Sequence, residues 1–300
     1  MNKSDTNEVI ESLKTFRQDL YDSFPGRADA NMDLLDSLSA NQTARSVVEL
    51  SLNEPFQREY SSVFDAIEHA ALIEKTQADD AQREAQREAL REAQREAQKI
   101  RTRIISTHLP APVQRPFWLF GVDATPNPRP FAPTLSDRSI VYQPNPAPGN
   151  KPIAVGHSYS ILAALPERGP HDPPWVVPLD CRRVASSQKA TAVAAEQIKA
   201  LLTDDALPFV RELTVEVADS GYCHAKYLHE MGGLTNHVVI VRSPNNRVFY
   251  RQPTPPTTPV RGHPRWYGEP FRLANPATWG RTRGMHDAGG PDQKGARIAH

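Results

Sequence analysis

Two aspartates stand where a carboxylate could do chemistry. Asp123 ends the apolar run FWLFGVD and Asp219 ends the alternating run LTVEVAD, so each is expected at the carboxyl end of a buried strand. Ligands of open α/β sheets bind at that edge. On neighbouring strands the two carboxyl groups would lie within about 4 to 8 Å, which suits a site for Mg²⁺ or Mn²⁺. The alternative is that each aspartate caps a helix or opens a turn.

Basic side chains gather toward the C-terminus, although 35 basic and 35 acidic residues cancel over the 300-residue chain. Residues 242–300 carry 10 basic and 3 acidic side chains, whereas residues 1–75 carry 7 and 14. Arginines interleaved with aromatic residues can hold phosphates and stack on bases, so this stretch is a candidate DNA-binding surface. A solvated, loop-borne set of charges is the alternative. The candidate DNA contacts are Arg242, Arg247, Arg251, Arg261 and Arg265.

The first hundred residues have the pattern of amphipathic helices. Between Ala81 and Gln98 a four-residue repeat of strong helix formers predicts one long helix. Leu90 is its only large apolar residue, so we expect a solvated connecting helix, with a DNA- or partner-contacting helix as the alternative. The helices upstream of it are predicted to pack on each other through an apolar stripe at three- and four-residue steps, which comprises Val9, Ile10, Leu13, Phe16, Leu20 and Phe24.

The composition changes near residue 109, because sixteen of the 28 prolines fall between Pro110 and Pro178. This density favours strands and loops over long helices. Seven elements of a mixed α/β sheet follow. They are strands Phe117–Val122, Ser139–Tyr142 and Tyr159–Leu165, helix Ser186–Leu202, strand Leu213–Ala218, helix Ala225–Glu230 and strand Val238–Val241.

Other reactive side chains carry weaker signals. Cys223, His224 and His229 fit no standard four-ligand zinc spacing, and His157 is expected to pack within its strand. Cys181 and Cys223 are too few for a disulfide framework, which favours the cytoplasm. No apolar run approaches the length of a membrane-spanning helix.

Six segments in order resemble a bacterial family of DDE transposases with an RNase H-like catalytic domain. They are FGVDAT, KPIAVGHSYSILAALPE, WVVPL, VADSGY, NRVFY and GHPRWYG, between residues 120 and 268. The resemblance implies a Mg²⁺-dependent nuclease and strand transferase acting on transposon ends and target DNA. Asp123 and Asp219 match the family's first and second catalytic acids.

The resemblance also implies a third acid, a glutamate on a later helix, and nothing after GHPRWYG matches it. Glu269 is the only glutamate beyond Glu230 and lies in a Pro- and Gly-rich loop. We therefore expect a truncated copy with weak or no transposase activity. One alternative is a non-catalytic DNA-binding remnant, and another is an interaction protein organised by the repeat helix. The sequence does not decide whether the chain forms a homodimer.

The predicted architecture has four parts. A helical N-terminal region, residues 1–78, is a candidate DNA-end-binding domain, and residues 79–108 form the helical repeat connector. Residues 109–280 form a partial RNase H-like domain, a mixed sheet incomplete at its C-terminus. Residues 281–300 are an expected disordered tail.

Overall fold

The computed structural model describes residues 3–24, 26–70, 80–143, 152–169, 172–255, 262–263 and 265–280. The predicted tail, 281–300, therefore lies outside the described residues. The main helices are α1 (Lys3–Asp22), α2 (Ala28–Ser39), α3 (Val47–Leu50), α4 (Ser61–Ala70), α5 (Asp80–Thr107), α6 (Ala190–Leu202) and α7 (Ala225–Met231), with short 3-10 turns η1 (Ser220–Tyr222) and η2 (Pro276–Thr278). The strands are β1 (Trp118–Pro128), β2 (Ser139–Tyr142), β3 (Ile153–Ala164), β4 (Val177–Val184), β5 (Thr214–Ala218), β6 (His237–Val241), β7 (Val248–Tyr250) and β8 (Pro270–Arg272).

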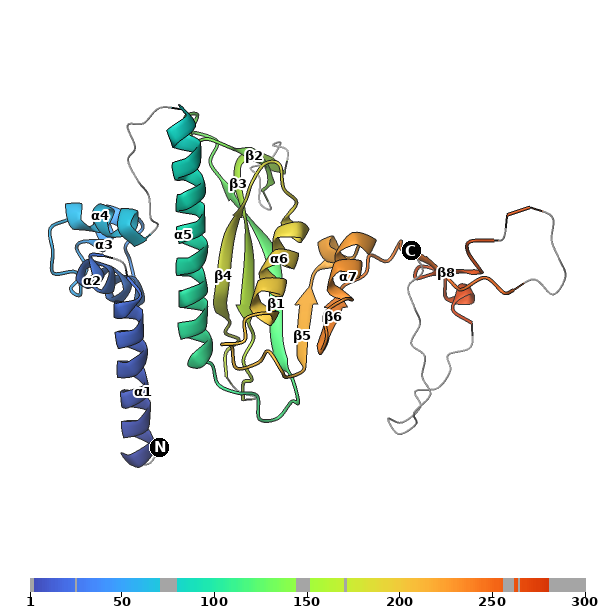
Figure 1. The fold of residues 1–300 in the computed structure, drawn as a ribbon, viewed down its shortest axis with the longest axis horizontal. Helices are drawn as coiled ribbons and strands as arrows, with labels where there is room; N and C mark the ends of the chain where they lie inside the picture. Colours follow the sequence, from blue (N-terminus) through green and yellow to red (C-terminus); the bar gives the residue numbers. More distant parts are fainter. Residues whose placement is uncertain are drawn as a thin grey trace.

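Six strands form one mixed sheet with β1 at its centre. The order is β2-β3-β1-β5-β6, and β4 pairs with the part of β3 that does not pair with β2. β1 is antiparallel to β3 and parallel to β5, which is parallel to β6. Figure 1 shows the N-terminal helices first and then this sheet, with α6 and α7 packed against it. The prediction of a mixed α/β chain with an RNase H-like sheet is confirmed.

The main core lies between the sheet and its helices. Alternate residues of β1, Trp118, Phe120 and Val122, are buried, as two-residue periodicity requires of a strand with one face toward a core. Phe209, fully buried, packs against Trp118 and Phe120 with ring centroids 5.3 and 5.0 Å away. The opposite face is less covered, since Val238 and Ile240 of β6 are 45% and 55% exposed. The sheet is thus anchored mainly from its helical side.

The repeat helix α5 forms as predicted, but it is more than a solvated connector. Its described residues between 92 and 96 are exposed, whereas Thr102 is buried. The side chains of Gln98 and Thr102 both donate to the carbonyl of Leu179 in β4, at 2.8 and 2.7 Å. Arg103 makes a bidentate ion pair with Asp204, with both N···O distances 2.8 Å. The last turns of α5 therefore belong to the layer of helices that packs on the sheet. The segment KIRTRIIST makes this packing possible, because it has apolar residues of its own.

The N-terminal helices differ from prediction in how they pack. Val9, Ile10 and Leu13 of α1 are 59%, 45% and 55% exposed, so the first half of the predicted stripe is not buried. The second half of α1 contacts its neighbours, since Phe16 packs against the ring of His108 with centroids 5.2 Å apart. Figure 1 shows α1 extending away from α2, α3 and α4, on the side of α5. A separate small core holds α2, α3 and α4 together, and its buried members are Ala30, Leu34, Phe56, Val63 and Ala66.

Strand ends also depart from the predictions. β1 runs on to Pro128, because β3 continues to pair with it as far as Gly156. β4 was missed, since Val177–Val184 contains a proline and three charged residues and has no regular alternation. As an edge strand it tolerates Pro178, and the register shift between Leu162 and Ala163 of its partner breaks the two-residue burial pattern.

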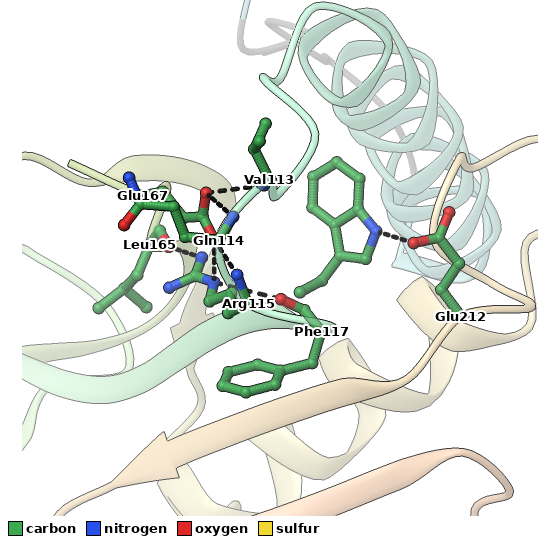
Figure 2. A network of polar contacts seen from close by, with 8 residues as sticks. Val113, Gln114, Arg115, Phe117, Leu165, Glu167 and Glu212 are labelled. Atoms are coloured by element: carbon green, nitrogen blue, oxygen red, sulfur yellow. Dashed lines mark hydrogen bonds and ion pairs between the residues drawn. The ribbon is translucent and has the colours of Figure 1, made fainter. Parts of the chain in front are cut away.

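A polar network fastens the linker before β1 to the sheet (Figure 2). The Glu167 carboxylate accepts hydrogen bonds from the backbone N–H groups of Val113, Gln114 and Arg115, at 2.6 to 3.0 Å. These bonds lower the pKa of Glu167. Arg115 in turn donates to the Leu165 carbonyl. The linker before β1 is thereby tied to the segment that follows β3.

None of the helices in the described part of the chain is both long and apolar enough to span a bilayer.

Candidate active site

Asp123 and Asp219 come to the same edge of the sheet. In the parallel β1–β5 pair Val122 lies opposite Ala218, so the next residue of each strand is one of the two aspartates. Adjacent strands are about 4.8 Å apart. Both residues are exposed. Asp123 lies within β1 and not at its end, but it marks the point where β1 loses β5 as a neighbour.

Each carboxylate is oriented by one backbone N–H group. Asp123 Oδ1 accepts from the N–H of Ala124 at 2.7 Å, and Asp219 Oδ1 accepts from the N–H of Gly221 at 2.8 Å, capping η1. Among the described residues, Oδ2 of each aspartate has no hydrogen-bond partner. The capping role proposed as the alternative is thus real for Asp219, yet it uses one oxygen only. Both residues keep an oxygen that can bind a ligand.

Tyr222 ends the η1 turn that follows Asp219 and belongs to the main core, and its hydroxyl is buried without a hydrogen-bond partner in the described part of the chain. The residue is 3% exposed. Burial raises the pKa of Tyr222, and the negative charges of Asp123 and Asp219 add to the increase. The phenol therefore stays protonated.

A buried polar network is centred on Glu216, three residues before Asp219. Glu216 is fully buried and accepts from the hydroxyl of Tyr227 and from His237 Nε2, the latter at 3.2 Å. His237 Nδ1 lies 2.9 Å from the hydroxyl of Thr214. Burial, with Glu216 beside it, raises the pKa of Tyr227, so its phenol remains the donor. Sequence reasoning missed this network, although the polar residues Thr214 and Glu216 at alternate positions of an otherwise apolar strand signalled it.

The candidate DNA-binding arginines are in different situations. Arg242 is exposed and follows β6 directly, and its N–H donates to the Ala218 carbonyl at 3.1 Å, which places it beside Asp219. Arg247 donates to the Cys223 carbonyl, and Arg251 donates to the Trp279 carbonyl at 2.7 Å. Arg265 is exposed. Arg261 lies outside the described residues.

The weaker candidates have structural roles. His157 is buried in β3, with Nε2 2.9 Å from the Ser136 carbonyl oxygen, as the packing interpretation requires. Cys223 is buried, and His224 caps α7 by accepting from the Tyr227 N–H. Glu269 is exposed in the segment before β8. No group of three or more His, Cys, Asp or Glu side chains that could hold a metal ion occurs among the described residues.

The donor set nevertheless fits a divalent cation. Carboxylate oxygens are the ligands that Mg²⁺ and Mn²⁺ prefer, and Mg²⁺ is commonly held by one or two carboxylates together with waters and phosphate oxygens. Two exposed carboxylates on neighbouring strands, each with an oxygen left available, meet that description. The third carboxylate of a complete three-acid site is not among the described residues near them.

A cavity of the described structure lies away from the two aspartates. It has a volume of about 740 Å³ and opens between α5, β4 and α6 over the buried Asp180. Asp180 pairs with Arg182 at 2.7 Å, and burial raises the pKa of Asp180. The two aspartates are not part of its lining, so it is a separate feature.

Comparison with known proteins gives one match. No curated protein and no solved structure is significantly similar to the chain. Residues 19–289 match the family model described as DDE superfamily endonuclease, which therefore covers both aspartates, all five arginines and most of the helical N-terminal region. The match continues past residue 280, where the catalytic domain was expected to end, and does not show a truncation. Family coverage of this extent, on a mixed sheet with acids at the β1–β5 edge, shows that the chain belongs to the DDE superfamily endonucleases.

Proposed function

We propose that this chain is a divalent-metal-dependent DNA endonuclease of the transposase type, with Asp123 and Asp219 as its metal ligands. The observation that supports the proposal most is the register of the parallel β1–β5 pair, which sets both acids at one edge. Members of the family act on DNA and generally use divalent metals, which agrees with the donor chemistry of the site.

The residues around the edge have separate tasks. The N–H groups of Ala124 and Gly221 hold one oxygen of each aspartate and so orient the other toward the ligand. Two carboxylates on adjacent strands repel each other, and a cation between them removes that repulsion. When bound, Mg²⁺ supplies Lewis-acid polarisation of a phosphate oxygen.

Arg242 is the strongest candidate for the DNA contact. It is exposed at the end of β6, next to the strand that carries Asp219, so its guanidinium can reach a phosphate beside the acids. Arg247 and Arg251 already donate to carbonyl groups, so part of their hydrogen-bonding capacity is used within the protein. We therefore rank Arg242 and Arg265 ahead of them.

Slow catalysis is part of the proposal. Within the described residues only two carboxylates are assigned to this edge, and removing one group that stabilises a transferring centre typically costs 10²-fold or more in rate. A second candidate function, DNA binding without cleavage, is favoured by the same observation.

A cleavage assay separates the two functions. Purified protein is incubated with supercoiled plasmid and with duplexes carrying candidate transposon ends, in Mg²⁺, Mn²⁺ or EDTA. We expect slow nicking that requires the metal and falls at least about 10²-fold in Asp123→Asn and in Asp219→Asn. Glu269→Gln is the matched control, because it removes an exposed carboxylate outside the site.

Two other outcomes decide the alternative. DNA binding with no cleavage in any metal would favour the non-catalytic function. Metal-dependent nicking that survives in both aspartate variants would refute the site.

A further inference from the structure

Exposed aromatic rings gather around the β7–β8 hairpin. Trp266, Tyr267 and Tyr250 are 71%, 51% and 50% exposed. Figure 1 shows β8 beyond β6, at the opposite end of the molecule from α1. Large apolar side chains that stand together on a surface mark an interaction site, whereas singly scattered ones need no explanation. The rings are therefore a candidate contact surface outside the six-stranded sheet.

These rings form two pairs. The imidazole of His263 stacks on the indole of Trp266, with centroids 4.9 Å apart and planes at 13°. Tyr250 and Tyr267 pack with centroids 5.0 Å apart and planes at 40°. His263 covers one face of the indole, and the high exposure of Trp266 leaves most of the ring open to solvent. A second flat ring can therefore stack on the indole without any rearrangement of the first.

The backbone that carries Trp266 and Tyr267 is tied to the end of β7. The N–H of Gly268 donates to the Arg251 carbonyl at 2.9 Å, and the N–H of Arg251 donates to the Glu269 carbonyl at 3.0 Å. A Cβ at position 268 would clash with the carbonyl oxygens of Gln252 and Arg251, so this close approach requires glycine. The two rings are thus presented on an ordered segment, which lowers the entropic cost of binding a partner.

The charge around the rings is positive. Residues 242–280 contain six arginines and a single acidic residue, Glu269. Arg265, the neighbour of Trp266, is exposed. Arg251 has a structural role instead, since its guanidinium donates to the Trp279 carbonyl at 2.7 Å and lies 5.8 Å from the centre of the Phe271 ring. The surface therefore suits a polyanion that also carries flat rings.

Unpaired nucleic acid meets both requirements. In a duplex the faces of the bases are covered by the neighbouring base pairs, whereas a single strand offers bases on which aromatic side chains can stack. Contacts between arginine and phosphate form with either kind of strand. The exposed rings are thus the feature that favours a single strand over a duplex.

We propose that the aromatic surface, formed by Tyr250, His263, Trp266 and Tyr267, binds single-stranded DNA. Bases stack on Trp266 and Tyr267, and the exposed Arg265 holds a phosphate. The inference rests on the proposed function, because it takes DNA as the partner of the chain. It adds the form of DNA that this surface recognises, and it requires no metal.

The test measures fluorescence anisotropy of a labelled oligothymidylate and of a labelled duplex of the same length, both in EDTA. Removing one stacking ring should weaken binding of the single strand about 5- to 150-fold in Trp266→Ala, and binding of the duplex less than about 2-fold. Arg265→Ala should weaken both, since phosphates are common to both. Trp175→Ala is the matched control, because Trp175 is an exposed tryptophan, at 45%, in the segment before β4.

A second measurement keeps an aromatic ring at position 266. Oligothymidylate should quench the tryptophan fluorescence of wild type, and the quenching should be smaller in Trp266→Phe, which should bind the single strand more tightly than Trp266→Ala does. Unchanged quenching in Trp266→Phe would overturn the inference. So would an equal loss on both DNAs in Trp266→Ala, or the same loss in Trp175→Ala.

Nicking assays on the same samples separate this inference from the proposed function. Asp123→Asn and Asp219→Asn should lose metal-dependent nicking and keep single-strand binding in EDTA. Metal-dependent nicking together with no selective effect of Trp266→Ala would overturn the role of the aromatic surface alone. Selective single-strand binding without nicking in any metal would support the aromatic surface and overturn the proposed cleavage.

Discussion

Tyr222 and Tyr227 are a natural pair for testing how buried hydroxyls act in this fold. Both are buried, at 3% and 1% exposure, and their rings touch, but among the described residues only the Tyr227 hydroxyl has a partner. Tyr227→Phe keeps the ring and its packing while leaving one oxygen of the fully buried Glu216 without its donor. A hydrogen bond to a charged group contributes about 1.5–3 kcal/mol, and stranding a buried charged acceptor adds to the cost. We therefore expect a loss of about 2–4 kcal/mol in the free energy of unfolding.

Urea denaturation followed by tryptophan fluorescence measures this loss, because Trp118 lies in the same core. Tyr222→Phe, measured in EDTA, is the matched control and should be neutral or stabilising. In a double-mutant cycle, Tyr227→Phe should cost much less in a Glu216→Gln background. If Tyr227→Phe changes stability by less than about 0.5 kcal/mol, or by the same amount as Tyr222→Phe, the assignment of a stabilising Glu216–Tyr227 bond is refuted.

Three further predictions concern the packing around the sheet. Ser160→Ala removes a buried 2.7 Å hydrogen bond to Gln197 between β3 and α6, and should cost about 1–3 kcal/mol by urea denaturation; a cost near zero would contradict the pairing. Phe209→Ala empties a fully buried aromatic site and should cost about 3–5 kcal/mol in the same assay, whereas a loss under about 1 kcal/mol would argue against this core. Asp204→Asn removes the ion pair with Arg103, which lowers the pKa of Asp204 below its ordinary value near 3.8. Its folded-state pKa is depressed, so the stabilisation is present above that ordinary value and is lost as the pH falls through the lowered one. The Tm of Asp204→Asn should therefore lie below wild type at pH 7 and converge with it in acid, and a pH-independent difference would contradict the assignment.

The sequence alone determined the class of the fold and indicated the two candidate acids. Apolar runs with an aspartate directly after them, FGVD and VEVAD, indicate strands that end in polar side chains, because a buried strand needs a continuous or alternating apolar pattern. The strong helix propensity of the repeat from Ala81 to Gln98 likewise predicted α5 without any tertiary information. These features are local, and local patterns can be seen in one segment at a time.

Pairing between distant segments was decided only by the tertiary structure. β4 was missed because an edge strand with a proline and charged residues has no local signature, and it is a strand only through its pairing with β3. The apolar stripe of α1 predicted burial that its surroundings do not supply, since Val9 and Leu13 remain exposed. An apolar stripe shows which residues a helix could bury. They are buried only where another element packs over them.

The site shows the same division. The two aspartates could be identified from their segments, but their meeting at one edge depends on the parallel register of β1 and β5, strands separated by about a hundred residues. The buried Glu216 and the unpaired hydroxyl of Tyr222 became visible only with the fold, because burial and hydrogen-bond pairing are properties of the packed chain. The sequence specified which groups are available, and packing decided which of them face water and which are buried with or without a hydrogen-bond partner.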